Sequence, residues 1–315
     1  MLANLVIAGA PKCGTTSLYH HLADHPQMAA SLRKETCYFM DPDYPLFREK
    51  SNYRDHGVAG YEEHFPPTLD PQVKWVYEAT PDYLYQRTAR DHLGDVNENM
   101  RIVFLLRHPA DHAYSMFKFA QNNIGTISKG LSFSAFLDDI RQKPERYRSR
   151  KIVASLVEHG HYIDYLAGWF ERHPNRISVY LFEDLRDSPV QFMKQFACDF
   201  DIDPDYFESA LLTKKNETIE TRNRQLHRIY RKLRRQPWVR SPRLRQAGAG
   251  LYQWVNKEGA GAKDGIRPQA SDEDRQALAQ LAAEYAPGIR ALESALGREL
   301  TAWQQQYPPA PQVNL

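Results

Sequence analysis

A short loop near the start of the chain has the residue types of a phosphate-binding site. The apolar residues 5–8 lead into Gly9, residues 10–14 form a tight turn, and Thr15 opens an amphipathic segment. In such a turn the backbone N–H groups converge on an anion, and the N-terminus of the following helix adds further donors and the positive end of its dipole. The spacing therefore predicts a strand, an anion-binding turn and a helix.

The position of the lysine distinguishes this loop from that of nucleoside triphosphatases. In those proteins the second glycine is followed by Lys and then by Ser or Thr, which bind the β/γ-phosphates and Mg²⁺. Here Thr15 follows Gly14, and the lysine of the loop, Lys12, lies two residues before that glycine. Lys12 is therefore expected to face a different atom of the ligand. A P-loop kinase acting on a small molecule is an alternative, but it should show a lysine after Gly14.

A second candidate phosphate site follows another strand. Residues 101–106 are typical of a buried parallel strand, Arg107 follows it, and Ser115 lies eight residues later in a helical segment. A nucleotide hydrolase often has a magnesium-binding aspartate at the end of such a strand. An arginine and a hydroxyl suit a phosphate bound without metal. The competing interpretation of Arg107 is an ordinary salt bridge at the end of a strand.

The two motifs together resemble those of the sulfotransferases that use 3′-phosphoadenosine 5′-phosphosulfate (PAPS). PKCGTTSL (11–18) resembles their 5′-phosphosulfate loop, and RIVFLLRHPADHAYS (101–115) resembles their 3′-phosphate motif. KETCYF (34–39) and EATPDYLY (78–85) resemble segments of the heparan-type branch, and residues 160–185 resemble the helix, strand and Glu-Asp-Leu ending of bacterial members. The resemblance covers most of residues 1–200. It implies a P-loop NTPase-like three-layer fold with a central parallel sheet.

The resemblance also implies a role for each candidate site residue. Glu35 matches the catalytic glutamate, and Lys12 matches the cation that stabilises the leaving phosphate. The remaining residues would bind the donor: Lys12, Cys13, Gly14, Thr15, Thr16 and Ser17 at the 5′-phosphosulfate, Arg107 and Ser115 at the 3′-phosphate, and Lys263 and Arg267, from the segment 261–268, in a loop that closes over the 3′-phosphate. No metal is expected.

Other residues compete with Glu35 for the role of general base. Glu78 lies in the second heparan-type segment, but Ala79 stands where that branch has a lysine, so a basic neighbour that would hold Glu78 near the acceptor is missing. His108 and His161 are rival bases, although a lone histidine is more often a packed or surface residue. The structural alternative for Glu35 is a solvated ion pair with Lys34 on a surface loop.

The order of the expected elements fixes the fold class. Alternating strands and helices imply an α/β fold with a parallel sheet. Strands are expected at 4–9, 74–79, 101–107 and 176–182, with a further extended piece near 27–31; helices are expected at 15–24, 110–122, 133–141, 160–173, 190–200 and 271–304. Ser188 and Pro189 are expected to begin the helix that ends at residue 200. Ser271 is expected to begin the helix over 271–304. We expect one domain over 1–305 and an extended tail over 306–315.

Composition limits the function classes. The formal net charge of +2 on 315 residues argues against a general nucleic-acid binder. The sequence shows no signal peptide and no apolar run of membrane-spanning length, so a cytoplasmic enzyme is expected. Cys13, Cys37 and Cys198 have no metal-ligand spacing and are expected to be reduced thiols. A small residue that fits the loop is favoured for Cys13 over a thiolate of lowered pKa.

Residues 222–245 form the strongest charge run and contain many arginines and no acidic residue. Within a basic insertion at 222–268, this segment resembles a basic amphipathic helix that could contact an anionic acceptor, a membrane surface or nucleic acid, or could be a solvated helix face. A nucleotide- or polyanion-binding protein without turnover is therefore a further alternative. The function favoured is transfer of sulfonate from PAPS to the hydroxyl or amine of a small molecule, lipid or glycan, releasing adenosine 3′,5′-bisphosphate.

Overall fold

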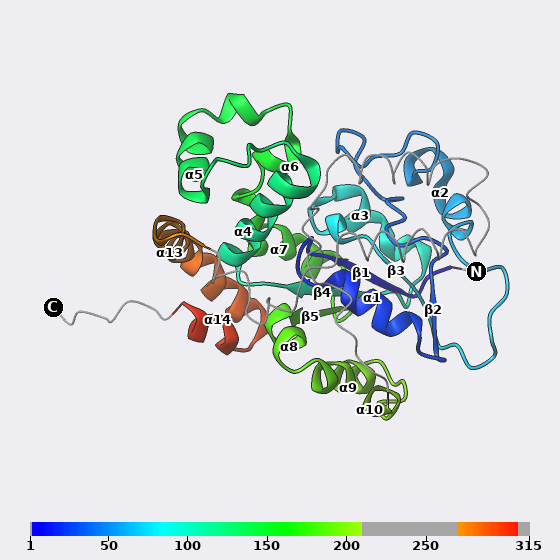
Figure 1. Ribbon diagram of the computed structural model, residues 1–315. Helices are drawn as coiled ribbons and strands as arrows, with labels where there is room; N and C mark the ends of the chain where they lie inside the picture. The colour runs from blue at the N-terminus through cyan, green and yellow to red at the C-terminus, as the bar shows by residue number, and fades with distance from the viewer. Residues whose placement is uncertain (1, 210–269, 308–315) are drawn as a thin grey trace, which may run out of the picture.

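The computed structural model describes residues 2–209 and 270–307. Its strands are β1 (Leu5–Gly9), β2 (Met28–Ala30), β3 (Trp75–Ala79), β4 (Arg101–Leu106) and β5 (Ile177–Leu181). Its helices are α1 (Thr15–Ala23), α2 (Tyr53–Glu62), α3 (Arg87–Val96), α4 (Pro109–Phe119), α5 (Phe133–Gln142), α6 (Lys151–Ala154), α7 (Tyr162–Arg172), α8 (Phe182–Asp187), α9 (Pro189–Asp199), α10 (Tyr206–Ser209), α13 (Asp272–Leu296) and α14 (Thr301–Gln306) (Figure 1). Short turns of helix lie at η1 (Pro81–Tyr85), η2 (Ala120–Ile124), η3 (Pro144–Tyr147) and η4 (Glu158–Gly160). Of the helices that the structure describes, none has both the length and the apolar character needed to cross a membrane.

The five strands form one parallel sheet in the order β2-β3-β1-β4-β5. The chain leaves the central strand β1 toward one edge of the sheet and later crosses to the other side of β1 through β4 and β5. Because all the strands are parallel, the loops that follow them meet at the same edge of the sheet. In open α/β sheets ligands bind at that edge, where the strand order reverses.

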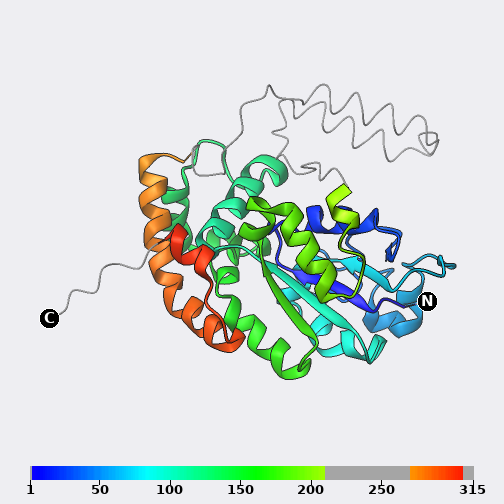
Figure 2. The ribbon, with the colours of Figure 1, turned by 90° about the horizontal axis from the view of Figure 1, so that it is seen from below.

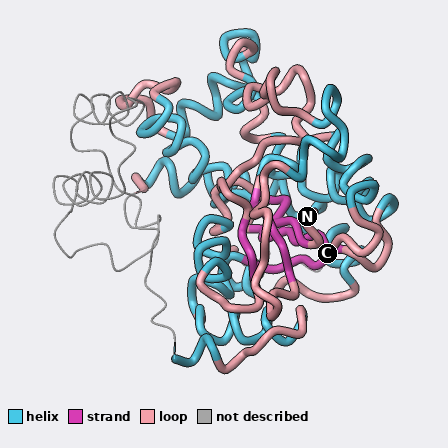
Figure 3. Tube along the Cα trace, turned by 90° about the vertical axis from the view of Figure 1, so that its right-hand side faces the viewer, coloured by secondary structure: helices cyan, strands magenta, loops and turns pink. Residues whose placement is uncertain are grey.

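Both faces of the sheet are buried, as the apolar sequence of its central strands requires. On β4 the side chains of Ile102 and Phe104 point into a core shared with α3 and α7, whereas those of Val103 and Leu105 point into a core shared with α1 and α9. This alternation follows from the two-residue period of a strand. The result is a three-layer α/β fold, and Figure 3 shows the strands enclosed by helices.

A separate helical core lies beside the sheet. Phe117 of α4, Phe133 and Phe136 of α5, and Leu281 and Tyr285 of α13 are buried together there. Figure 2 shows α13, near the end of the chain, lying beside α4 and α7. The C-terminal helices are therefore built into the fold next to the helix that follows Arg107.

The sequence prediction is confirmed for all five strands and for the expected helices up to residue 200. It is wrong about the last helix. The expected helix over 271–304 ends at Leu296, because Gly297 has the left-handed φ of 62° that closes a helix, and α14 is a separate element. Ser271 caps α13 as expected by accepting a hydrogen bond from the Asp274 N–H. Ser188 occupies the N-cap position of α9, but its side chain makes no capping bond.

Candidate functional site

The phosphate loop follows the central strand β1. The Ala10 N–H donates to the Leu105 carbonyl at 2.8 Å, which holds the loop against β4. Lys12 and Gly14 both have left-handed backbone conformations, with φ of 63° and 85°. A Cβ atom on Gly14 would lie 2.8 Å from the ring of Phe182, so both the backbone angle and the close packing require glycine.

The first turn of α1 presents its backbone donors to this loop. Gly14 is the N-cap residue and supplies no side chain to accept from the N–H groups of that turn. The first N–H groups of a helix have no partner within it and suit an anion. Thr15 is buried, while Thr16 and Ser17 are half-buried. The structure thus brings together Lys12, Gly14 and the three hydroxyl residues, as the sequence predicts.

Lys12 and Arg107 place two positive charges close together. The Lys12 ammonium lies 4.7 Å from the centre of the Phe119 ring, and it forms no ion pair with any residue that the structure describes. Burial lowers the pKa of Lys12, and the nearby guanidinium of Arg107 lowers it further. Two adjacent cations that disfavour each other's charge are stabilised by an anion placed between them.

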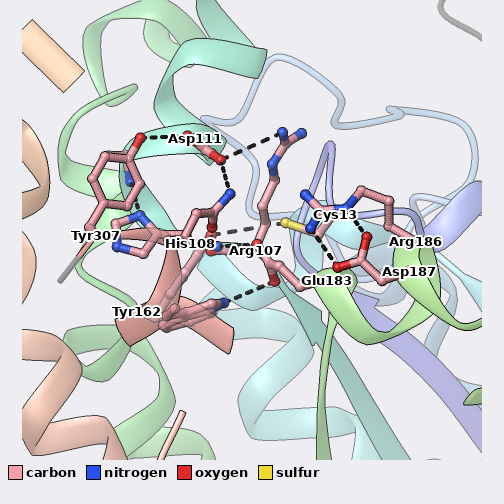
Figure 4. A network of polar contacts seen from close by, with 12 residues as sticks. Cys13, Arg107, His108, Asp111, Tyr162, Glu183, Arg186, Asp187 and Tyr307 are labelled. Carbon is pink, nitrogen blue, oxygen red and sulfur yellow. Dashed lines mark hydrogen bonds and ion pairs between the residues drawn. The ribbon is translucent and has the colours of Figure 1, made fainter. Parts of the chain in front are cut away.

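Arg107 is buried at the end of β4 with its hydrogen bonds incomplete. Its guanidinium stacks on Phe182, 4.8 Å from the ring centre, and its Nη2 lies 4.0 Å from Asp111. Asp111 also accepts hydrogen bonds from Gln306 and Tyr307, both at 2.7 Å. The buried Nε of Arg107 has no partner within the described residues. Figure 4 shows Asp111 between Arg107 and Tyr307. A loose contact to one shared carboxylate is weaker than the salt bridge that was the competing interpretation.

Ser115 lies on α4, the helix that begins two residues after Arg107, and it is 6% exposed. The residues of the predicted 3′-phosphate site are therefore on one strand–turn–helix unit beside the phosphate loop.

Two residues that the sequence prediction did not single out hold this turn in place. Glu183, in the first turn of α8, accepts hydrogen bonds from the His108 N–H at 3.0 Å and from the Trp303 indole at 2.9 Å. The Tyr162 hydroxyl of α7 donates to the Arg107 carbonyl at 3.0 Å and lies 3.9 Å from the Cys13 sulfur. Both belong to the 160–185 segment whose resemblance was noted, so the motif was the available signal.

Glu35 lies at the same edge of the sheet. Its N–H donates to the carbonyl of Ala79, the last residue of β3, at 3.1 Å. The Glu35 side chain is 46% exposed and forms an ion pair with Lys34 at 2.7 Å, while Lys34 is 17% exposed. The pair that was the structural alternative is thus present, and it leaves the carboxylate open to solvent. The guanidinium of Arg48 donates a hydrogen bond to the Glu35 backbone carbonyl at 3.0 Å and so holds this part of the loop in place.

Glu78 has a different environment from Glu35. It is fully buried, and hydroxyl groups of four side chains lie within hydrogen-bond distance of its carboxylate: Thr36 at 2.8 Å, Thr80 at 2.6 Å, Tyr61 at 2.8 Å and Tyr83 at 3.1 Å. These hydroxyls replace the basic neighbour that Ala79 cannot supply. A carboxylate so enclosed cannot reach an acceptor oxygen.

The hydroxyl partners of Glu78 shape the loop that carries Glu35. The Tyr83 oxygen accepts from the N–H groups of Tyr38 and Phe39 at 2.9 and 3.2 Å, and the Thr80 oxygen accepts from the Cys37 N–H at 3.3 Å. Glu35 and Cys37 both have positive φ, 63° and 52°, which is uncommon outside glycine. The Glu78 network holds this unusual backbone in one conformation.

The rival histidines have structural environments. His108 is 2% exposed, and its Nδ1 caps α4 by accepting from the Ala110 N–H at 3.2 Å. Its ring also packs on Tyr307, 4.3 Å between centres. His161 precedes α7, and its ring meets Tyr285 edge-on. Neither histidine lies on the loop that carries Glu35.

The environment of Cys13 agrees with the favoured interpretation of a small residue that fits the loop. Its side chain is fully buried, and its N–H is already bonded to the Ala10 carbonyl at 3.3 Å. Burial raises the pKa of the Cys13 thiol to about 12, so the thiolate is not favoured.

We therefore predict that one thiol of the folded protein reacts rapidly with a disulfide reagent such as 5,5′-dithiobis(2-nitrobenzoate) at pH 8. Cys198 is exposed, whereas Cys37 is buried like Cys13 and burial raises its pKa to about 12. All three thiols should react after denaturation, and Cys198→Ser should abolish the rapid phase. A rapid phase that persists in Cys198→Ser would show that a loop thiol is activated.

Some predicted features lie outside the described residues. These are Lys263 and Arg267, with the segment 261–268, and the basic segment 222–245. Among the residues that the structure does describe, no cluster of three or more His, Cys, Asp or Glu side chains could hold a metal ion.

Comparisons with known proteins identify the family. The family model described as "Sulfotransferase domain" matches residues 2–203. The chain is 31% identical over 121 residues to the membrane-associated sulfotransferase kil1 of Dictyostelium discoideum, covering 38% of this chain and 23% of the relative. It is 21% identical over 213 residues to the human bifunctional heparan sulfate N-deacetylase/N-sulfotransferase 3, covering 67% of this chain and 24% of that relative. The chain thus spans about a quarter of the length of these relatives.

A solved structure agrees on the fold. The sulfotransferase from Alicyclobacillus acidocaldarius superposes with a TM-score of 0.61 at 20% sequence identity, covering 96% of this chain and 99% of that one. The family model covers the phosphate loop, the turn at Arg107, and the strand β5 with the helix α8 that follows it. Of the parts of the site that the structure describes, it leaves out only the C-terminal helices. The chain belongs to the sulfotransferase family.

Proposed function

We propose that this sulfotransferase takes its sulfonate from PAPS and transfers it to an acceptor hydroxyl or amine, releasing adenosine 3′,5′-bisphosphate. One observation carries the proposal: Lys12 and the incompletely bonded Arg107 converge at the carboxyl edge of the sheet, next to the open N-terminus of α1. That arrangement offers two anion sites on neighbouring strands, and a nucleotide with separate 5′ and 3′ phosphates supplies two anions.

The residues present fit such a donor. The N–H groups of the first turn of α1, with Thr15, Thr16 and Ser17, would hold the 5′-phosphate, and Arg107 with Ser115 would hold the 3′-phosphate. Lys12 would neutralise the negative charge that grows on the oxygen between sulfur and the 5′-phosphate as that bond breaks. PAPS supplies the activated sulfonate when bound.

Glu35 is the proposed general base. It would take the proton of the acceptor hydroxyl while the acceptor oxygen forms its bond to sulfur and the bond to the 5′-phosphate oxygen breaks. Its half-exposed carboxylate is open to an acceptor, whereas that of Glu78 is enclosed. Lys34 would hold the Glu35 carboxylate in place through their 2.7 Å ion pair.

We expect adenosine 3′,5′-bisphosphate to raise the melting temperature of the protein more than ATP with Mg²⁺ does. At about a hundredfold excess over its Kd a ligand stabilises the folded state by about 2.7 kcal/mol. Differential scanning fluorimetry at matched nucleotide concentrations measures the two shifts. An equal or larger shift with ATP and Mg²⁺ would favour the kinase alternative instead.

Relatives indicate possible acceptors without fixing one. The human relative is named for heparan sulfate, and the Dictyostelium relative is named as membrane-associated. The acceptor of this chain is therefore proposed as a small molecule, lipid or glycan. The residues beside Glu35 indicate which of these classes fits.

A further inference from the structure

An open cleft lies beside the candidate site. Its volume is about 620 Å³, within the range of small-molecule sites. It is lined by the loop that follows Glu35, by the end of η1 and the start of α3, and by α6, η4 and α7: Asp41, Pro42, Asp43, Tyr44, Tyr85, Gln86, Arg87, Lys151, Ala154, Ser155, His159 and Tyr165.

Aromatic rings form the walls of the cleft. The Tyr85 and His159 rings are stacked in parallel with their centres 3.7 Å apart, and Tyr165 meets Tyr85 edge-on at 4.9 Å. Burial lowers the pKa of His159 to about 3, so this ring is neutral near pH 7. Burial also raises the pKa of Tyr44, Tyr85 and Tyr165, which keeps their hydroxyls protonated. Such walls offer ring faces and neutral polar groups.

The cleft adjoins both parts of the transfer site. The hydroxyl of Tyr44 donates to Asp82 at 2.6 Å. Burial, together with the negative charge of nearby Glu35, raises the pKa of Asp82 to about 6. Asp82 is therefore bonded to a residue of the cleft and lies near the proposed base. On the other side, Tyr85 of the cleft lies close enough to Cys13 of the phosphate loop for the two side chains to interact electrostatically.

The charges that line the cleft cancel. Lys151 is bound to the Asp43 carboxylate at 2.6 Å. Asp41 caps α3 by accepting from the Arg87 and Thr88 N–H groups at 3.0 and 2.9 Å. The lining thus contains two carboxylates, Asp41 and Asp43, and two cations, Arg87 and Lys151. A polyanion would find no surplus of positive charge among these residues.

We propose that this cleft binds the acceptor, and that the acceptor is an uncharged hydroxyl compound built on a ring, a phenol or a ring sugar, rather than an anionic glycan chain. The ring would pack on Tyr85 and Tyr165, and its hydroxyl would point toward Glu35. This inference rests on the proposed function and narrows its substrate class.

Three acceptor probes test the proposal: 2-naphthol for a phenol, phenyl β-D-glucopyranoside for a sugar, and N-desulfated heparin for an anionic glycan. Each is incubated with the full chain and ³⁵S-labelled PAPS, and initial rates are measured over a range of acceptor concentrations. We expect saturable labelling of 2-naphthol or of the glucoside, with kcat/KM at least tenfold above that for N-desulfated heparin. Which of the two is labelled tells a phenol site from a sugar site.

Tyr165→Ala tests whether the reaction uses this cleft. It should raise KM for the labelled neutral probe at least tenfold and leave the melting shift by adenosine 3′,5′-bisphosphate unchanged. Tyr206→Ala, on α10 and away from the cleft lining, is the matched control and should leave KM unchanged.

Three results would overturn the proposal: preferential labelling of N-desulfated heparin, an unchanged KM in Tyr165→Ala, or no labelling of either neutral probe by protein that binds adenosine 3′,5′-bisphosphate. If adenosine 3′,5′-bisphosphate did not raise the melting temperature of the wild-type protein, that result would instead contradict the proposed function itself.

Discussion

Lys12→Ala is expected to lower the rate of sulfonate transfer by at least about a hundredfold, the usual loss when one group that stabilises transition-state charge is removed. The Lys12 ammonium stands beside Arg107 in the loop where the bond to the leaving phosphate would break. Replacing the side chain should preserve the fold, because Lys12 is half-buried and makes no ion pair among the described residues. Steady-state rates with labelled PAPS measure the effect on kcat.

Lys118→Ala is the matched control for this variant. Lys118 also lies near an aromatic ring, 5.9 Å from the centre of Tyr114 on α4, but it follows the Arg107 turn by three turns of helix. It should keep near wild-type kcat. If Lys12→Ala kept it as well, the displaced lysine of the loop would have no part in the reaction.

Glu35→Gln is also expected to lower kcat strongly. A general base contributes about 10²–10⁴-fold to a rate, and glutamine cannot take up the acceptor proton. The substitution keeps the shape of the side chain, and the backbone bonds of Glu35 to Ala79 and Arg48 do not involve the carboxylate. We therefore expect kcat to fall by that factor while the melting shift by adenosine 3′,5′-bisphosphate is unchanged.

Glu63→Gln, at the exposed end of α2, is the control for loss of one negative charge. Near-normal turnover by Glu35→Gln would move the role of base to another group. Asp82 would be the first to test, because it lies near Glu35 and is bonded to Tyr44 of the cleft. Glu78 and His108 are both enclosed by their partners.

The sheet and the two phosphate motifs could be predicted from sequence because their signals are local. An apolar run followed by a glycine turn determines β1 and the start of α1, and a buried run that ends in Arg107 determines β4 and its turn. Parallel pairing then requires that both turns lie at one edge, which brings Lys12 near Arg107.

The support of the site could not be predicted, because it depends on residues far apart in the chain. Glu78 is bound by hydroxyls from three segments, and the nearest sequence signal, Ala79 in place of lysine, indicated only that something was missing. The contact of Gln306 and Tyr307 with Asp111 joins positions almost 200 residues apart. The helices α2 and α3 were not predicted either: α2 has a non-helical residue at Gly57 and buries little apolar surface.

The most direct test of the central claim is transfer of ³⁵S from labelled PAPS to an acceptor by the wild-type protein, with Lys12→Ala run in parallel. Fractions of a cell lysate and the neutral probes serve as acceptors, and adenosine 3′,5′-bisphosphate is quantified in the same samples. We predict labelled product and an equal amount of the bisphosphate with wild-type protein, and neither with Lys12→Ala. Bound nucleotide without any labelled product, or equal labelling by the two proteins, would contradict a sulfonate transfer that depends on the loop lysine.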